Sequence, residues 1–218
     1  MRPSPLRLGE AERDRLTTGA AALGIELDPA ASARLAGFAD ALDVWNAKTN
    51  LISCGSATEL VDRHILDALA LDPLLPDEGA IADLGSGAGF PGLPIAVVRP
   101  DQHILLIESR RRKANFLREV KRLLRLGNVE VREQRAEAAP EPSERVLAVV
   151  SRAVWSDASL TMLAPSWLKT GGRLFWMRAD HSDPTNERGS SCELSWERRM
   201  SYSIGAGPRR VVDIFLRT

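Results

Sequence analysis

The chain has 218 residues, of which 44% are hydrophobic and 27% charged, a composition typical of a soluble globular protein that can bury a core. Its 29 Lys and Arg residues balance 29 Asp and Glu residues, so overall charge cannot attract it to nucleic acid, and such binding needs a local patch. Cys54 and Cys192 lie far apart without a metal-ligand spacing, and no stretch resembles a signal peptide or a membrane span. We expect a reduced, cytoplasmic protein that works as a monomer, holds no metal and does not contact a membrane.

The first 75 residues show helical periodicity. Asp28 and Pro29 are a typical N-cap and first helical residue for the second of three expected helices. A polar loop over 46–55 separates the second helix from the third. The expected helices cover residues 9–23, 29–45 and 57–71. Residues 1–75 are therefore predicted to form an N-terminal helical extension packed on the core.

From Ala80 onward, short apolar runs alternate with helical patterns, which predicts an α/β fold with a doubly wound parallel sheet. Two alternating segments at the C-terminal end predict an antiparallel terminal strand pair, for about seven strands over 76–218. Residues 179–192 are polar and match no element. The expected strands are 81–84, 103–108, 128–132, 146–151, 172–178, 193–202 and 210–216. Three helices are expected between them: one that follows Pro91, one over 110–126 and one over 157–168. Gly127 and Asn128 are expected to stop the helix over 110–126.

The stretch AIADLGSGAGFPG, residues 80–92, is a buried strand that leads through glycines into a helix. Such a turn leaves backbone donors open to a ligand at the carboxyl edge of a sheet. One frame, from Gly87 to Gly92, matches the dinucleotide pattern G-x-G-x-x-G, with Glu108 at the distance of an acid that holds a ribose. The other frame, D-x-G-x-G-x-G from Asp83 to Gly89, is typical of S-adenosylmethionine (SAM) methyltransferases. A purely structural turn is the third interpretation.

The frame that starts at Asp83 favours SAM. Asp83 ends the first strand, where a carboxylate suits the sulfonium cation and the ammonium group of SAM. Glu108 ends the second strand, where it suits the two ribose hydroxyls. The glycines of the predicted cofactor turn are Gly85, Gly87 and Gly89.

Four segments occur in an order and spacing that resemble one family: WNAKTNLIS at 45–53, LVDRHILDALAL at 60–71, DLGSGAGFPGLPIAVVRPD at 83–101 and VSRAV at 150–154. They are similar to the bacterial ribosomal RNA small subunit methyltransferase G family, also called glucose-inhibited division protein B, which methylates N7 of a guanine in 16S rRNA. The resemblance implies a seven-stranded, Rossmann-like methyltransferase sheet, SAM as methyl donor, and 16S rRNA or the small ribosomal subunit as partner. The SAM-binding positions that it implies are Gly85, Phe90, Ala136, Glu137 and Arg152.

Methylation of guanine N7 needs no general base, because N7 carries an in-plane lone pair and no proton. Catalysis then depends on aligning the nucleophile, the methyl carbon and the sulfur. We expect Arg152 near the methyl group, with Arg63 and His64 beside the site as positioning residues. Without the resemblance, the simpler interpretation is that Arg63 and Asp67 form an i,i+4 helix pair and that His64 is a buried histidine.

One candidate RNA-binding patch lies on the polar face of the helix over 110–126. A solvated helix face explains the same pattern, and phosphate contacts would make the binding salt-dependent. The basic residues of this patch are Arg110, Arg111, Arg112, Lys113, Arg118, Lys121, Arg122 and Arg125.

The chain departs from the family after the strand over 172–178. Arg178 and Ala179 stand where the family usually carries a Leu-Lys-Gly-like segment, so the substrate contacts of that loop are open. Two other functions also remain open: a SAM-dependent methyltransferase of a small molecule or a protein, and a non-catalytic nucleotide-binding regulator.

Overall fold

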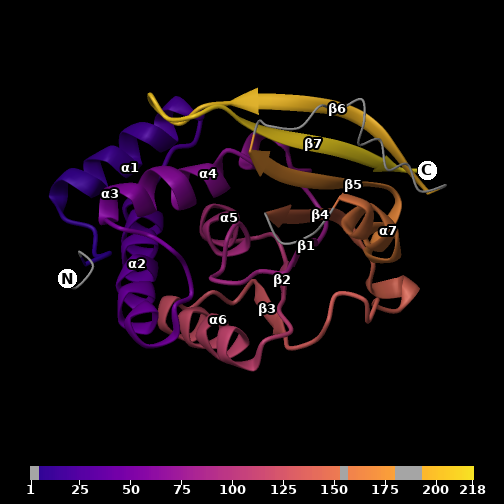
Figure 1. Ribbon diagram of the computed structural model, residues 1–218, viewed down its shortest axis with the longest axis horizontal. Helices are drawn as coiled ribbons and strands as arrows, with labels where there is room; N and C mark the ends of the chain where they lie inside the picture. The colour runs from indigo at the N-terminus through magenta and orange to yellow at the C-terminus, as the bar shows by residue number, and fades with distance from the viewer. Residues whose placement is uncertain (1–4, 153–156, 180–192) are drawn as a thin grey trace.

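The computed structural model describes residues 5–152, 157–179 and 193–218, and a seven-stranded sheet forms its centre (Figure 1). The strands stand in the order β3-β2-β1-β4-β5-β7-β6. Strands β1 to β5 run parallel, and β7 is antiparallel to both of its neighbours. The predicted parallel sheet with an antiparallel terminal pair is therefore confirmed. The strands are β1 (Ile81–Leu84), β2 (Ile104–Ile107), β3 (Val129–Arg132), β4 (Val146–Arg152), β5 (Leu168–Ala179), β6 (Leu194–Tyr202) and β7 (Arg210–Arg217).

Helices precede the sheet and connect its parallel strands, and Figure 1 shows α1 to α4 gathered at one end of the molecule. The predicted polar segment beyond Ala179, up to Cys192, lies outside the described residues. The helices are α1 (Glu10–Ala22), α2 (Pro29–Thr49), α3 (Ala57–Leu60), the π-helix η1 (Val61–Ile65), α4 (Leu66–Leu69), the 3₁₀ turn η2 (Asp72–Leu74), α5 (Gly92–Val98), α6 (Arg111–Leu124), the 3₁₀ turn η3 (Pro142–Glu144) and α7 (Asp157–Trp167).

Two predicted helix ends were wrong. Helix α2 continues past Trp45 to Thr49, and Asn50 ends it in the left-handed region with φ of 48°. Helix α6 ends before Gly127, because Arg125 adopts φ of 54° and the next amide, of Leu126, bonds back to the carbonyl of Lys121. Leu126 is buried. Burial of this side chain ends the helix at Leu124, earlier than the end that the stop at Gly127 predicts.

The N-terminal helices and the sheet share one hydrophobic core. The ring centroid of Phe38 in α2 lies 5.1 Å from that of Phe90, which follows the glycine turn, and 6.4 Å from that of Phe116 in α6. These ring contacts pack the N-terminal helices against the glycine turn and against α6. The division of the chain at residue 75 stays a prediction.

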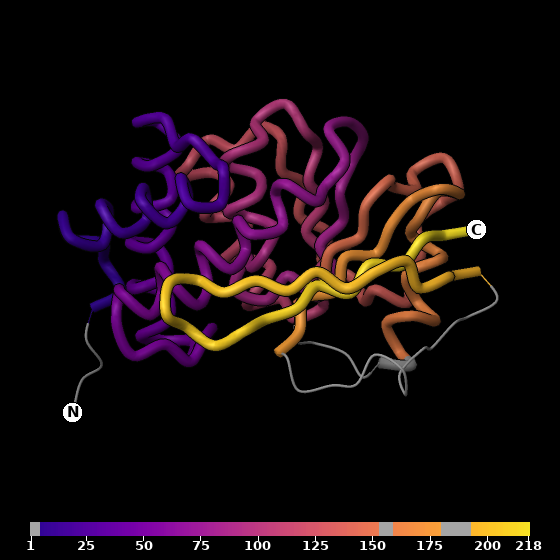
Figure 2. The backbone as a smooth tube through the Cα atoms, turned by 90° about the horizontal axis from the view of Figure 1, so that it is seen from above, coloured from indigo at the N-terminus to yellow at the C-terminus, as the bar shows by residue number. Residues whose placement is uncertain are grey.

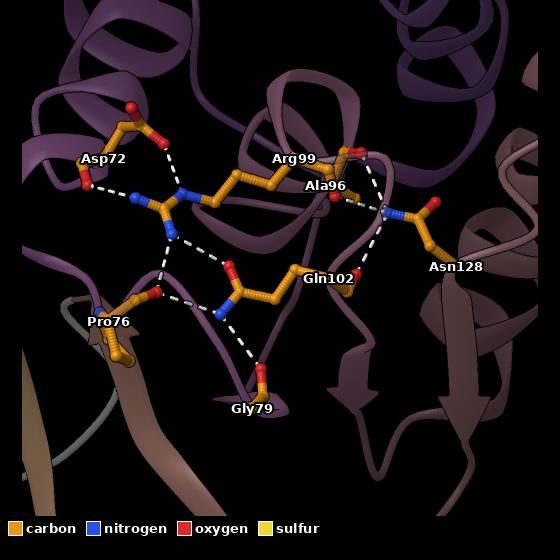
Figure 3. Close-up of polar contacts among 7 residues, drawn as sticks. All are labelled: Asp72, Pro76, Gly79, Ala96, Arg99, Gln102 and Asn128. Atoms are coloured by element: carbon orange, nitrogen blue, oxygen red, sulfur yellow. Dashed lines mark hydrogen bonds and ion pairs between the residues drawn. The ribbon is translucent and has the colours of Figure 1, made fainter.

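Arg99 joins the connection after α4 to the end of α5 (Figure 3). Its guanidinium pairs with the Asp72 carboxylate and donates to the carbonyls of Asp72 and Pro76, each at 2.7 Å. Gln102 accepts a further bond from Arg99 and donates to the carbonyls of Pro76 and Gly79. The segment between the helical part and β1 is therefore held by side chains at the end of α5 and in the loop that leads to β2.

The β6–β7 hairpin runs along the molecule and reaches over the N-terminal helices (Figures 1 and 2). At its tip, Ile204 shares a cavity with Arg15 of α1 and Asp62 of η1. The C-terminal hairpin and the N-terminal helices thus lie side by side, although they are far apart in the sequence.

Replacing Arg99 tests this connection. We expect Arg99→Ala to lower the free energy of unfolding by about 2–3 kcal/mol, because it removes the donor to the half-buried Asp72 carboxylate and to the Asp72 carbonyl, and leaves the Pro76 carbonyl with Gln102 alone. Urea denaturation measures the change. The matched control is Arg122→Ala, which removes an exposed arginine paired only with Glu119 and is expected to leave the unfolding midpoint unchanged. Equal effects of the two substitutions on the free energy of unfolding would show that the Arg99 contacts contribute nothing to stability.

Candidate cofactor and substrate site

The glycine turn follows β1 and is held against the end of β2. The amides of Gly85 and Ser86 both donate to the carbonyl of Ile107, at 2.9 and 3.1 Å. Gly85, Gly87 and Gly89 have φ of 78°, 58° and 91°, a region that side chains disfavour. A Cβ at Gly89 would also lie 2.3 Å from Leu93 Cδ1. This turn therefore needs glycine both for its backbone conformation and for its close packing.

Asp83 lies beneath the turn and is fully buried. Its Oδ2 accepts a hydrogen bond from the Gly92 amide at 3.0 Å, which ties the end of β1 to the start of α5. Its Oδ1 is buried without a hydrogen-bond partner among the described residues. Burial raises the pKa of Asp83 to about 7. In this structure Asp83 supports the turn from below, and its predicted contact with the SAM cation stays a prediction.

A cavity of about 460 Å³ opens above the turn, at the carboxyl ends of β1 and β2. We call it the donor cavity. The Glu108 carboxylate accepts from the amides of Gly87, at 3.0 Å, and Arg110, at 2.7 Å, so backbone donors fix its position. A fixed carboxylate with further lone pairs suits a ribose diol. The lining residues are Gly85, Gly87, Ile107, Glu108, Ser109, Arg110, Lys113, Gln134, Arg135, Ala136 and Glu137.

Trp167 holds the far wall of the donor cavity in place. Its indole Nε1 donates to the carbonyl of Ala136 at 2.7 Å in a buried contact. Gln134 adds a second restraint, because its amide donates to the carbonyl of Ala138 at 2.8 Å. The sequence analysis missed Trp167, because nothing local connects the last residue of α7 with a loop 31 positions earlier in the chain.

A second cavity of about 560 Å³ lies by the end of β4. We call it the arginine cavity. Arg152, Arg63 and His64, the predicted positioning residues, all line it, beside Arg210 and Asp67. The other described residues that line it are Ser53, Glu59, Met177, Arg178, Ala179, Tyr202, Pro208 and Arg209.

Asp67 is the buried centre of the arginine cavity. Its Oδ2 lies 3.2 Å from Arg152 Nη1, and its Oδ1 accepts from the Tyr202 hydroxyl at 2.7 Å and pairs with Arg210 Nη1 at 2.5 Å. The expected pair of Arg63 with Asp67 was wrong, since Arg63 pairs with Glu59 at 2.7 Å. The π-helix η1 widens the turn between positions 61 and 65, and Asp67 faces the sheet while Arg63 is exposed.

His64 is neutral in the folded protein. Burial, and then the nearby Arg152 charge, lower its pKa to about 4. The ring Nδ1 lies 3.0 Å from Arg152 Nη2, and because a guanidinium only donates, Nδ1 accepts and Nε2 carries the proton. The Arg152 guanidinium also lies 5.0 Å from the centre of the Phe90 ring. His64, Phe90 and Arg152 therefore form one packed group beside the glycine turn.

The structure thus brings the predicted site residues into three groups. Five of the cofactor candidates line the donor cavity: Gly85, Gly87, Glu108, Ala136 and Glu137. Asp83, Gly89 and Phe90 are buried: Asp83 beneath the turn, Gly89 within it and Phe90 directly after it. Arg152, Arg63 and His64 line the arginine cavity. Residues that the sequence analysis missed at these two cavities are Lys113, Trp167, Tyr202 and Arg210.

The basic patch of α6 is partly neutralised. Arg118 pairs with Glu133 and Arg122 pairs with Glu119, both at 2.8 Å. Lys113 turns toward the donor cavity, where its Nζ lies 3.8 Å from the place that a Cβ at Gly87 would take. Arg178, at the departure from the family pattern, packs its guanidinium 4.3 Å from the Trp176 ring centre and pairs with Asp213.

Among residues 5–152, 157–179 and 193–218, no group of three or more His, Cys, Asp or Glu side chains is placed to hold a metal ion. None of the helices described above combines the length and the apolar character needed to cross a membrane.

The sheet order, the glycine turn and the fixed acid after β2 define a SAM-dependent methyltransferase. Solved structures share this fold: M. jannaschii TYW2 in complex with AdoMet (TM-score 0.55, 17% identity, 71% of this chain and 76% of that one) and ribosomal protein L11 methylase from Lactobacillus delbrueckii subsp. bulgaricus (0.56, 14%, 72% and 79%). The chain belongs to the rRNA small subunit methyltransferase G family, whose sequence model matches residues 31–212.

Curated relatives agree with this family. Ribosomal RNA small subunit methyltransferase G of Desulfotalea psychrophila is 43% identical over 149 residues, which cover 67% of this chain and 68% of the relative. The enzyme of the same name from Stenotrophomonas maltophilia strain K279a is 36% identical over 203 residues, 91% and 92% of the two chains. The protein is thus an enzyme with SAM as its cofactor, and the dinucleotide interpretation of the turn was wrong.

Trp167→Phe tests the wall of the donor cavity. Loss of the indole donor frees the carbonyl of Ala136, and we expect SAM to bind about fivefold more weakly, as for one lost hydrogen bond of about 1 kcal/mol. Calorimetric titration measures the affinity. Trp45→Phe is the matched control, because Trp45 packs against Phe116 away from this cavity. Unchanged affinity in the Trp167 variant, with the fold retained, would contradict the assignment.

Asp83→Asn tests the buried acid. Between about pH 4 and pH 7 the folded protein retains a proton on Asp83 that the unfolded chain has lost, so this acid makes stability fall as the pH rises through that range and has no further effect above it. We expect the variant to lack this fall, which is at most about 1.4 kcal/mol per pH unit. Urea denaturation from pH 5 to pH 8 compares the two proteins. Identical pH dependence would refute a raised pKa at Asp83.

Proposed function

We propose that this protein transfers the methyl group of SAM to N7 of a guanine in small-subunit (16S) ribosomal RNA. The match of the family sequence model over residues 31–212 carries the proposal. The reaction places the enzyme in the cytoplasm, with 16S rRNA or the small ribosomal subunit as its partner. We expect it to act as a monomer.

The donor cavity fits SAM by the chemistry of its donors and acceptors. Glu108 offers a fixed carboxylate for the ribose hydroxyls, and Ala136 and Glu137 offer the opposite wall for the adenine. Gly85 and Gly87 expose backbone at the turn, since neither carries a side chain. When bound, SAM supplies a methyl group on a sulfonium centre, an electrophile that an unprotonated ring nitrogen attacks directly.

The arginine cavity supports a reaction without a general base. His64 cannot take a proton through Nδ1, because Arg152 donates to that atom, and its pKa of about 4 keeps it neutral. Both carboxylate oxygens of Asp67 are already engaged by donors, from Arg152, Tyr202 and Arg210. Guanine N7 has no proton to lose, so this arrangement matches its methylation. Arg152, Arg63 and His64 then act by positioning the base.

A different methyl acceptor is the alternative. Where the attacking atom of a small molecule or a protein side chain is a hydroxyl oxygen or a protonated nitrogen, a base must remove its proton. The Asp67 and His64 environments do not provide one.

Mapping of modified bases by mass spectrometry tests the proposal. We expect rRNA from a strain that lacks the protein to have lost one 7-methylguanine in the small-subunit RNA, and the wild-type protein to restore it. Glu108→Ala is expected to restore it poorly, with a KM for SAM raised about tenfold or more, because the ribose contact is lost. Persistence of every 7-methylguanine in the deletion strain would disprove the function.

A further inference from the structure

The arginine cavity holds more positive than negative charge. Five arginines line it, and Glu59 and Asp67 are the two carboxylates among its described lining residues. Glu59 pairs with Arg63 at 2.7 Å, and Arg178 pairs with Asp213, a carboxylate that does not line the cavity. Asp67 is therefore shared by Arg152 and Arg210, one negative charge between two guanidinium groups.

Arg152 and Arg210 converge on the same acceptors. Besides Asp67, both donate to the carbonyl of Arg63, at 3.2 and 3.3 Å. Both side chains are about 17% exposed, so their positions are fixed by packing while an edge of each stays open to the cavity. Two like charges held this close repel each other, and an anion in the cavity would relieve the repulsion.

We propose that Arg152 and Arg210 form a clamp for a backbone phosphate of the RNA beside the target guanine. The inference rests on the proposed function and names the surface that receives the substrate. A planar guanidinium matches a phosphate through two parallel N–H donors, so two of them can hold one phosphate from both sides. The cavity lies at the end of β4, beside the glycine turn, where a nucleotide would have to enter to reach the methyl group.

The C-terminal hairpin supplies half of this clamp. Arg210 begins β7, Arg209 precedes it, and Tyr202 ends β6. The Tyr202 hydroxyl donates to Asp67, and burial beside that carboxylate raises the tyrosine pKa, so the hydroxyl keeps its proton and its hydrogen bond. The hairpin is thus held against η1 and α4 at the point where Arg210 faces the cavity.

The basic patch of α6 is the competing RNA surface. Its Arg118 and Arg122 each have a carboxylate of their own, in Glu133 and Glu119. These pairs are exposed, and one anion per cation leaves no local excess at either arginine. The shared Asp67 distinguishes the arginine cavity from that surface.

Arg210→Ala tests the clamp. Asp67 keeps Arg152 and Tyr202 as partners in this variant, so the fold is expected to survive. Unmodified 16S rRNA and small subunits from the deletion strain are the two probes, and binding is measured with whichever one the wild-type protein methylates. We expect the dissociation constant for RNA to rise about tenfold, the slope of log K against log salt to fall by about 1, and SAM affinity to stay unchanged.

Arg210→Lys is the conservative variant and keeps the test usable if Arg210→Ala is unstable. Its ammonium retains the charge opposite Asp67 but cannot form the planar double contact, so RNA affinity should fall only about threefold. Arg112→Ala on α6 removes one charge outside the cavity and is expected to bind RNA as the wild type does.

Three outcomes overturn the clamp. RNA affinity unchanged in both Arg210 variants excludes it. A loss of RNA affinity in Arg112→Ala but not in Arg210→Ala would show that α6 binds the RNA. A loss of SAM affinity in Arg210→Ala without a loss of RNA affinity would assign Arg210 to the cofactor site. In each case a wild-type protein that still methylates the guanine leaves the proposed function standing, whereas a wild-type protein that methylates neither probe refutes that function.

Discussion

The carboxylate of Asp67 is the constraint on which the arginine cavity depends. A buried carboxylate is stable only when charged or polar donors surround it. Asp67 finds them in Arg152, 85 positions later, and in Tyr202, 135 positions later. Helix α4, the end of β4 and the C-terminal hairpin are therefore held to one point, and the arginine cavity forms around it.

The two cavities are built from different groups. The donor cavity uses two glycines of the turn, the Glu108 carboxylate held by backbone amides, and the loop at Ala136 whose carbonyl accepts from Trp167. The arginine cavity is made of guanidinium groups fixed by Asp67 and by the carbonyl of Arg63. Phe90 and Arg152 pack between the turn and the arginine cavity, so the two ligands would meet over this pair.

The glycine turn and its acids could be predicted from the sequence, because their positions follow from short segments of neighbouring residues. Asp83, Gly85 and Glu108 stand at strand ends, and strand ends were readable from short apolar runs. Asp67, Tyr202 and Arg210 could not be predicted as a cluster, because they meet only when the fold brings α4 against the β6–β7 hairpin. The end of α6 shows the same limit on a small scale: the burial of Leu126 overrode the helix stop expected at Gly127.

The hairpin at the C-terminal end has a consequence for synthesis of the chain. A nascent chain that has emerged up to β5 already contains every residue of the donor cavity, but it lacks Tyr202 and Arg210. Asp67 then has one arginine in place of two, and the hairpin edge of β5 is open. The arginine cavity is thus completed last, so a chain that ends after β5 keeps the whole lining of the donor cavity and lacks the hairpin side of the arginine cavity.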